Sequence, residues 1–375
     1  AERALTLLRP HFAGDRLAPD LSACVAESFT FDAPVRWLDD RTGLLELFHG
    51  PTAAFKDYGA RFLAACLVRL REPGRPTTVL VATSGDTGAA VAAAFHRRAG
   101  MRVVVLYPDG RVSPRQAHQL GAFGDNVATF RVAGTFDDCQ RLVKEAFADR
   151  ELAARHGLVS ANSISLGRLL PQSAYFVHGA LEARTKAPEP AHVIVPTGNL
   201  GNAFACLLAR DAGAPIGDVV LATNGNRVLP DFLASGRYEP RTSVPTLANA
   251  MDVGAPSNLE RLRHRYPDPA RVVTADAVDD ETIRTTIRDV LRATGVVVCP
   301  HTACGLAVLR RRRERGDRRL HFVAATAHPA KFDSVVEPLI GRTIDVPPAL
   351  AELLARPSRA EPLRGALADL AAALR

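Results

Sequence analysis

From Thr78 onward, short apolar runs rich in β-branched residues alternate with alanine-rich stretches that have the length of helices. The strand-like runs are Val79–Ala82, Val103–Leu106, Ala128–Val132, His192–Val195, Val219–Ala222 and His321–Ala325. The helix-like stretches between them include Gly88–Arg98, Thr135–Ala148, Leu169–Arg184 and Gly201–Ala212. Strands that alternate with helices indicate βαβ units. The sequence therefore predicts an α/β fold with mostly parallel sheets flanked by helices.

Three polar turns follow strand-like runs directly, at Thr83–Gly88, Thr197–Asn202 and Thr326–Pro329. The first two are rich in glycine and each precedes a helix-like stretch. Ligands of parallel α/β sheets bind at the carboxyl ends of the strands, where such turns lie. We therefore expect the binding site to be built from these three turns.

The length of 375 residues exceeds the size at which one hydrophobic core keeps growing, so we expect two domains. The proline-rich segment Ala187–Pro190 separates the first block of strands from the second and is the expected return into the second domain. No apolar run has the length of a membrane span, and no signal-peptide pattern opens the chain. We therefore expect a cytoplasmic protein that does not interact with membranes.

The formal charge of +7 raises the question of nucleic-acid binding. Arginines are spread along the whole chain, and their densest run, Arg310–Arg319, is interrupted by acidic residues and contains no aromatic side chains. This pattern is typical of a solvated helix end, so we expect no nucleic-acid partner. A modest positive field favours a small anionic substrate instead. Only four of the 47 basic residues are lysine, namely Lys56, Lys144, Lys186 and Lys331.

Six cysteines are scattered along the chain without a C-x-x-C pair. Cys299, His301 and Cys304 are close in sequence, but they lack the second ligand pair of a zinc site. We therefore expect reduced, mostly buried thiols and no metal.

The turn Gly198–Asn202 follows a strand and opens a helix, where successive N–H groups form a nest for a phosphate. It matches neither common nucleotide-binding motif, and an ordinary glycine-rich turn remains the alternative. Thr83–Gly88 has the same setting, and its Ser84 and Thr87 suit a substrate carboxylate. Asp86 or Thr87 alone would more often be a simple helix cap.

Lys56 follows the apolar residues Ala53–Phe55 and precedes Asp57. A Schiff-base lysine must be neutral for part of its cycle, and apolar surroundings lower the pKa of its amine. A lone lysine beside an aspartate is more often a surface ion pair.

Taken together, these stretches resemble the threonine synthases, a family within the fold type II (tryptophan synthase β-like) enzymes that use pyridoxal 5'-phosphate (PLP). The resemblance covers about Pro34 to Leu350. Nine motifs match in order: LFHGPTAAFKD (Leu47–Asp57), ATSGDTGAAV (Ala82–Val91), YPDGRVSPRQ (Tyr107–Gln116), ANSIS–RLLPQ (Ala161–Gln172), VPTGNLGN (Val195–Asn202), AMDVGAPSN (Ala250–Asn258), AVDDETI (Ala277–Ile283), PHTACG (Pro300–Gly305) and TAHPAKF (Thr326–Phe332). One such motif can arise by chance, whereas nine in register do not.

The resemblance implies a two-domain enzyme with PLP as its cofactor. Residues 45–185 would form a smaller, mobile α/β domain that carries the PLP lysine and the substrate-carboxylate loop. Residues 1–44 and 186–375 would form the larger PLP-binding domain. The protein would be a monomer or a homodimer.

The resemblance also assigns a role to each candidate site residue. Lys56 would hold the cofactor and move protons at Cα and Cβ of the substrate. The cofactor would further be bound by Asp86 near its 3'-oxygen, by Thr326 at its pyridine nitrogen, and at its phosphate by Gly198, Asn199, Leu200, Gly201 and Asn202. Ser84 and Thr87 would bind the substrate carboxylate. The phosphate of the substrate, O-phosphohomoserine, would be bound by Asn162, Ser163 and Arg168, whose guanidinium matches phosphate oxygens.

The implied reaction is the PLP-dependent conversion of O-phospho-L-homoserine and water to L-threonine and phosphate. Three departures from the family leave alternatives open: Ser165 replaces an asparagine, Arg227 and Asp231 exchange the usual positions of Asp and Arg, and an N-terminal segment usual in the family is missing. A trimmed chain, a processed chain and a naturally short homologue all account for the last. One alternative function is a related phospho-lyase or γ-replacement enzyme that acts on another phosphorylated amino acid. Another is a non-catalytic ligand-binding homologue.

Overall fold

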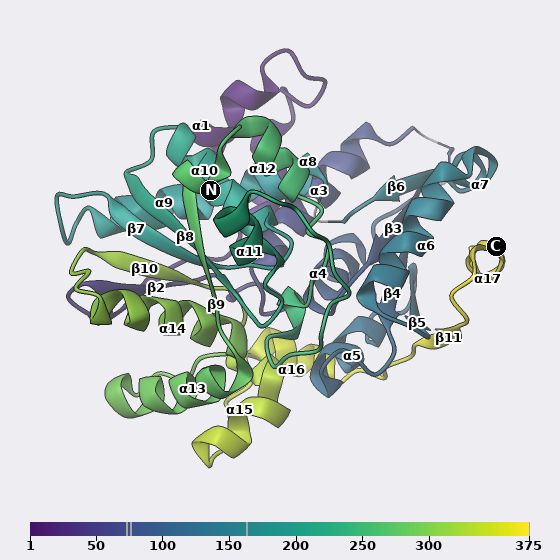
Figure 1. The fold of residues 1–375 in the computed structure, drawn as a ribbon. Coiled ribbons are helices and arrows are strands. Elements are labelled where there is room, and N and C mark those ends of the chain that lie inside the picture. Colours follow the sequence, from purple (N-terminus) through teal and green to yellow (C-terminus); the bar gives the residue numbers. More distant parts are fainter. Residues whose placement is uncertain (73, 76, 163, 375) are drawn as a thin grey trace.

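The computed structural model describes residues 1–72, 74–75, 77–162 and 164–374, and it contains two sheets with helices on their faces (Figure 1). The six-stranded sheet has the order β1-β2-β10-β7-β8-β9, and the five-stranded sheet has the order β11-β5-β4-β3-β6. Every strand pair is parallel except β1–β2. The predicted α/β fold class with mostly parallel sheets is confirmed.

The strands of the six-stranded sheet are β1 (Val35–Asp39), β2 (Thr42–Glu46), β7 (Ala191–Pro196), β8 (Ile216–Thr223), β9 (Val273–Ala277) and β10 (His321–Ala325). Those of the five-stranded sheet are β3 (Thr77–Ala82), β4 (Met101–Pro108), β5 (Val127–Val132), β6 (Leu158–Ser160) and β11 (Glu361–Leu363). Each of the six strand-like runs lies within one of these strands.

The α-helices are α1 (Glu2–Leu8), α2 (Leu21–Ser28), α3 (Lys56–Leu70), α4 (Asp86–Phe95), α5 (Pro114–Gly121), α6 (Phe136–Ala148), α7 (Arg150–His156), α8 (Leu166–Leu169), α9 (Ser173–Ala183), α10 (Gly201–Asp211), α11 (Val228–Ser235), α12 (Leu259–Arg265), α13 (Asp280–Thr294), α14 (Pro300–Glu314), α15 (Asp333–Ile340), α16 (Pro348–Leu354) and α17 (Leu367–Ala373). Short 3₁₀ turns are η1 (Arg9–Phe12), η2 (Leu170–Gln172), η3 (Asn249–Met251), η4 (Pro269–Arg271) and η5 (Pro329–Phe332). None of the described helices combines the length and apolar character that a bilayer crossing requires.

The central strands are buried on both faces, which is why their sequences are continuously apolar instead of alternating. In β7, Val193 and Val195 join a core with α9 and α10, whereas Ile194 faces a core with α13 and α14. In β3, Val79 faces the core of α3 and α4, and Leu80 faces that of α6. Successive side chains of a strand point to opposite faces, so each sheet carries two helical layers.

The C-terminal segment, residues 350–374, is not made of surface helices alone. Helices α16 and α17 do form, but β11 lies between them and pairs with β5 (Figure 1). Leu363 and Leu370 are buried in the core with α6. Three residues with a proline are too short a strand for a periodicity signal, so the sequence did not indicate it.

Two segments pack across the expected division into residues 45–185 on one side and residues 1–44 and 186–375 on the other. Strand β11 lies in the five-stranded sheet, because Leu363 completes the core of that sheet. Helix α9 instead contributes Phe176 and Ala180 to the core of the six-stranded sheet. The domain boundaries at 45 and 186 remain a prediction.

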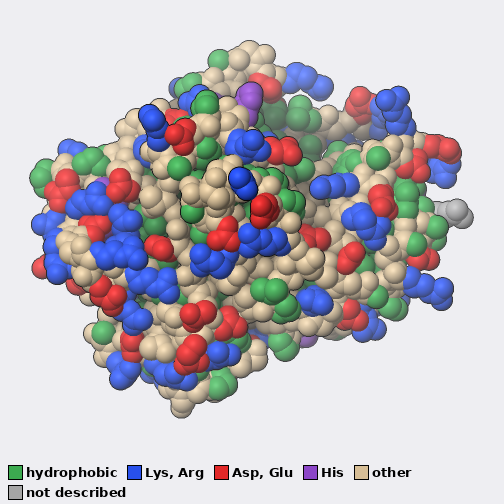
Figure 2. Space-filling view, in the orientation of Figure 1, with side chains coloured by type: hydrophobic (Ala, Val, Ile, Leu, Met, Phe, Trp, Pro, Cys, Tyr) green, Lys and Arg blue, Asp and Glu red, His purple; other side chains and the backbone are tan. Residues whose placement is uncertain are grey.

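Acidic and basic side chains are interspersed over the face shown in Figure 2. The arginine run that ends α14 pairs with acids: Arg310 Nη1 lies 3.0 Å from Asp289 Oδ2, and Arg319 Nη2 lies 2.9 Å from Asp218 Oδ2. All six cysteines are buried and free, as expected.

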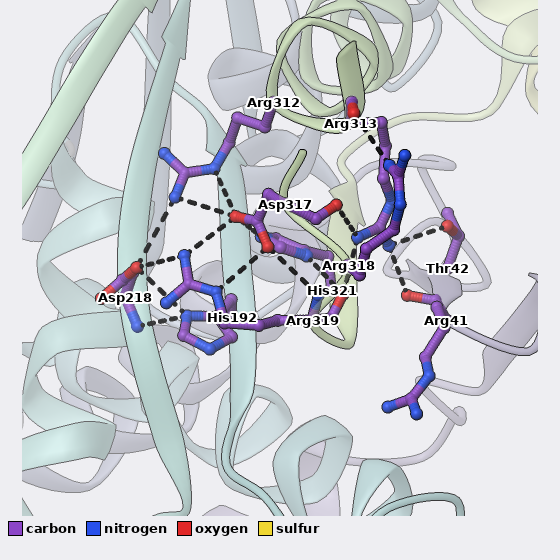
Figure 3. A network of polar contacts seen from close by, with 10 residues as sticks. All are labelled: Arg41, Thr42, His192, Asp218, Arg312, Arg313, Asp317, Arg318, Arg319 and His321. Carbon is purple, nitrogen blue, oxygen red and sulfur yellow. Dashed lines mark hydrogen bonds and ion pairs between the residues drawn. The ribbon is translucent and has the colours of Figure 1, made fainter. Parts of the chain in front are cut away.

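A network of polar contacts lies at the amino ends of β7 and β10, opposite the turns that follow these strands (Figure 3). The Arg319 guanidinium holds the pKa of Asp317 well below its usual range. His321 is fully buried, and its Nδ1 lies 2.9 Å from the carbonyl of Arg319. Burial lowers the pKa of His321 to about 4, outweighing the hydrogen bond to Arg319 and the nearby Asp317. The native chain therefore holds this ring neutral.

The neutral His321 makes stability depend on pH. Between pH 6.5 and pH 4 the unfolded chain binds a proton at this ring and the folded chain does not, so stability is lost as the pH falls. We expect this ring to lower the free energy of unfolding by up to about 3 kcal/mol over that range. Denaturant titrations at pH 7 and pH 4.5 should show a smaller loss for His321→Asn than for the native chain. The exposed control His11→Asn should not change the loss, and equal losses in all three proteins would contradict the assignment.

Candidate active site

One cavity is lined by all three predicted turns, which follow β3, β7 and β10. Its walls include the predicted residues Lys56, Ser84, Asp86, Thr87, Arg168, Gly198, Asn199, Leu200, Gly201, Asn202 and Thr326. The turns after β7 and β10 meet because the carboxyl ends of these neighbouring parallel strands face the same way, and the turn after β3 reaches them from the other sheet.

Lys56 is the first residue of α3 and projects its amine into the cavity. The loop before it is fixed by a hydrogen bond of 2.9 Å from the Phe55 N–H to the Thr326 carbonyl. Burial lowers the pKa of Lys56 to about 8, and Lys331 and Arg168 act in the same direction against the opposing effect of Asp86. The protonated and the neutral amine are therefore both populated close to physiological pH.

The turn before α4 is organised by Thr83, whose Oγ1 accepts hydrogen bonds from the N–H groups of Gly85 (2.9 Å) and Gly88 (2.8 Å). Gly85 has φ +124°, a conformation that favours glycine. Gly85 is the N-cap of α4, and Thr83, rather than Asp86 or Thr87, accepts the N–H of Gly88 in the first turn. Asp86 is free to turn its buried carboxylate into the cavity.

Three side chains surround the Asp86 carboxylate. Its Oδ1 accepts from Lys331 Nζ at 2.9 Å and from Gln116 Nε2 at 2.9 Å, while Lys56 Nζ lies 3.8 Å from Oδ2. Burial raises the pKa of Asp86, but Lys331 and Lys56 outweigh burial and hold that pKa well below its usual range. The carboxylate is therefore charged.

The turn before α10 forms a cradle of backbone N–H groups. Leu200 is in the left-handed conformation (φ +63°), and its N–H donates to Thr197 Oγ1 at 3.1 Å. A Cβ on Gly198 would lie 2.8 Å from both the Cα and the carbonyl oxygen of Met251, so this glycine is required by close approach. Asn202 Nδ2 is buried and has no hydrogen-bond partner among the described residues. A helix N-terminus with a free amide donor can hold a phosphate.

Arg168 is a buried guanidinium on α8. Its Nη1 donates to the Ala161 carbonyl at 2.7 Å, whereas its Nε has no hydrogen-bond partner within the part of the chain that the structure describes. Burial lowers the pKa of Arg168 to about 10, which still leaves it charged at neutral pH. Burying a charged group with an unused hydrogen-bond donor costs folding free energy unless an anion pairs with it.

Asn162 lies beside the main cavity instead of in it. It lines an adjoining cavity together with Thr87 and Asn199, and its Oδ1 accepts a hydrogen bond from the Ala82 N–H at 3.1 Å. The predicted partner Ser163 lies outside the described residues. The structure thus places the candidate cofactor-binding and carboxylate-binding residues in one cavity with Arg168. Asn162 lies in the adjoining cavity.

The sequence reasoning missed three residues of the site, His301, Gln116 and Lys331. His301 Nε2 accepts a hydrogen bond from the Ala250 N–H at 3.1 Å, and burial lowers the pKa of His301 to about 4, so the ring is neutral. All three lie within motifs that carried the resemblance, and Lys331 is one of only four lysines. Motif membership and the scarcity of lysine are thus the sequence features that could have indicated these three residues. Among the described residues no group of His, Cys, Asp and Glu side chains could hold a metal ion.

The residues present fit PLP. The α10 N-terminus with Gly198 and the unpartnered Asn202 Nδ2 can receive its phosphate, and the Lys56 amine can receive its aldehyde. Thr326 follows β10 and faces the same cavity with a neutral hydroxyl.

Comparison with known proteins first gives the class. A family model described as "Pyridoxal-phosphate dependent enzyme" matches residues 43–324. The chain is thus a PLP-dependent enzyme with the fold type II architecture.

The comparisons then give the family. A second model, "Threonine synthase, C-terminal", matches residues 302–373. The threonine synthase of Escherichia coli is 43% identical over 345 residues, covering 91% of this chain and 80% of the relative. The crystal structure of the E. coli enzyme superimposes with a TM-score of 0.91 at 39% identity, over 99% of this chain and 86% of that one. A PLP-bound threonine synthase from Brucella melitensis gives a TM-score of 0.87 at 33% identity, over 100% and 87% of the two chains. The chain belongs to the threonine synthase family.

The cradle before α10 makes a specific prediction. Gly198→Ala places a methyl group 2.8 Å from the Met251 backbone, so the turn must move and PLP should bind more weakly by about tenfold or more. Gly225→Ala is the matched control, because its nearest neighbour would be Thr246 Cγ2 at 3.8 Å. Equilibrium titration of the PLP absorbance in both variants measures the effect. Equal PLP affinities of the two variants would show that this turn does not bind the cofactor.

Proposed function

We propose that this chain eliminates phosphate from O-phospho-L-homoserine and adds water at Cβ, which yields L-threonine and inorganic phosphate. The observation that carries the proposal is Arg168, a buried guanidinium with an unused donor in the same cavity as Lys56. An uncharged substrate would leave this guanidinium without a counter-charge, whereas a phosphate completes it.

Three anionic groups require three receptors, and the cavity supplies them. The N-terminus of α10 receives the cofactor phosphate, and the turn at the N-terminus of α4, with Ser84 and Thr87, receives the substrate carboxylate. Arg168 receives the substrate phosphate, with Asn162 and Ser163 as its proposed partners. This arrangement fixes the substrate at both ends and so presents its Cα and Cβ to Lys56.

PLP would bind through Lys56 and, once the substrate amine has taken the place of Lys56, would withdraw electrons from the substrate and make its Cα and Cβ protons acidic. Lys56 is then the base that takes these protons as the phosphate leaves Cγ, and the acid that returns protons to Cγ and Cα. Water supplies the hydroxyl at Cβ, and its other proton ends on the released inorganic phosphate. An amine whose pKa is about 8 suits both tasks, because both of its protonation states are accessible near neutral pH.

Asp86 and Thr326 are proposed to contact the cofactor ring. Asp86 lies beside Lys56 and is charged, which suits a position near the 3'-oxygen and its proton. Thr326 would meet the pyridine nitrogen with a neutral hydroxyl and leave the ring a weaker electron sink than a carboxylate would.

The departures from the family lie away from the cavity. Arg227 Nε and Asp231 Oδ1 form an ion pair at 3.4 Å, and both side chains are partly exposed at the start of α11. Ser165 precedes α8, and it lines neither the main cavity nor the adjoining one. These positions give no support to a different phosphorylated substrate. The cavity around Lys56, which can receive a cofactor and a substrate, likewise gives no support to a non-catalytic role.

The substrate is a small amino acid. The monomeric or homodimeric state and the cytoplasmic location remain predictions.

Arg168→Leu tests the proposed phosphate receptor. Loss of the guanidinium should lower kcat/KM for O-phosphohomoserine by about 2–5 kcal/mol in free-energy terms, with little change in PLP affinity. Unphosphorylated homoserine should not be turned over by either protein. The control Arg61→Leu removes a partly buried arginine of α3 that does not line the cavity. Equal losses in the two variants, or turnover of homoserine, would contradict this assignment.

Ser165→Asn restores the residue usual in the family and separates the two enzymatic interpretations. Because Ser165 does not line the cavity, we expect threonine formation to stay within about threefold of the native rate, equivalent to ~0.7 kcal/mol. The measurement is phosphate release with identification of the amino-acid product. A native chain that makes little threonine, and a variant that makes much more, would favour a different native substrate.

A further inference from the structure

Two buried lysines share one carboxylate in the cavity. Asp86 Oδ1 lies 2.9 Å from Lys331 Nζ, and Asp86 Oδ2 lies 3.8 Å from Lys56 Nζ. The side chain of Lys331 is 1% exposed and that of Lys56 is 11% exposed. Lys331 therefore has the closer contact with Asp86 and the drier environment.

A second contact, besides that with Asp86, holds the Lys331 amine in place. Lys331 comes from η5, and its Nζ also donates to the Thr52 carbonyl at 2.7 Å. Thr52 is itself anchored to the start of α3, because its N–H and Oγ1 donate to the Asp57 carboxylate at 2.9 Å and 2.7 Å. Lys331 thus joins three segments: the turn after β10, the loop that carries Lys56, and the start of α4.

The titratable side chains that face Lys56 come from four elements, and three of these side chains are charged. Asp86 on α4 is the carboxylate, and the cations are Lys331 on η5 and Arg168 on α8. His301 on α14 is neutral, because burial lowers its pKa to about 4. Asp86 is the carboxylate that faces Lys56, whereas the buried Asp57 on α3 interacts with Lys331. Of the two lysines, Lys56 has the longer contact with Asp86 and no other acceptor among the described residues, so its proton is the less well held.

We propose that Lys331 is a positioning residue that occupies Asp86, so that Asp86 does not neutralise Lys56 in full and Lys56 remains the lysine that gives up its proton. This inference rests on the proposed role of Lys56, and it adds a second lysine with a distinct task. Lys331 holds the carboxylate, and Lys56 carries out the chemistry.

The low lysine content permits a direct test. Full-length chain labelled with ¹³C at lysine Cε, with PLP removed, should give four lysine signals whose pH titrations report each amine separately. In the native chain the Lys56 signal should titrate first. In Lys331→Met, Asp86 pairs with Lys56 alone, and the Lys56 titration should move up by about one pH unit. Lys331→Arg keeps the charge and should restore a titration close to the native one. Lys186→Met, at an exposed position, is the control and should leave Lys56 unchanged.

An unchanged Lys56 titration in Lys331→Met would overturn the proposal, as would a native chain in which Lys56 does not titrate first. If Lys331→Met does not fold, Lys331→Gln keeps a donor for the Thr52 carbonyl without the charge, and it is judged by the same shift. If neither variant folds, the order of titration in the native chain decides. No substrate enters this measurement, so its failure is distinct from a failure of the proposed reaction, which appears only in product formation.

Discussion

The site depends on one constraint of parallel sheets, namely that the carboxyl ends of neighbouring strands open on the same side. The turns after the neighbouring strands β7 and β10 therefore meet, and the turn after β3, which belongs to the five-stranded sheet, lines the same cavity from the other side. Two of these turns begin helices, so the free N–H groups and positive dipole ends of α4 and α10 point into one cavity. The scaffold thus provides receptors for anions before any charged side chain is added.

Burial then determines what the charged side chains can do. Asp86, Lys331 and Arg168 are almost inaccessible to water, so each must find a partner or leave a charge uncompensated. Asp86 and Lys331 satisfy each other, whereas Arg168 keeps an unused donor that an anionic substrate can complete. Lys56 is left with the weakest hold on its proton, and that is the property a Schiff-base lysine needs.

The strands that are buried on both faces could be predicted from sequence, because continuous apolar runs bounded by glycine turns leave few alternatives. Strands β1, β2, β6, β9 and β11 were not predicted; β9 carries polar residues, and β6 and β11 have only three residues each. The site divides in the same way. Lys56 and the Gly198–Asn202 turn carry local signals, whereas the contact between Lys331 and Asp86 joins residues 245 positions apart and depends on the fold alone.

The central claim is that Lys56, and not its buried neighbour Lys331, holds the cofactor. The most direct measurement is borohydride reduction of the PLP-loaded protein, followed by peptide mapping of the pyridoxyl group by mass spectrometry. The label is expected on Lys56 alone. A label on Lys331, or retention of the reducible PLP absorbance in Lys56→Ala, would contradict it.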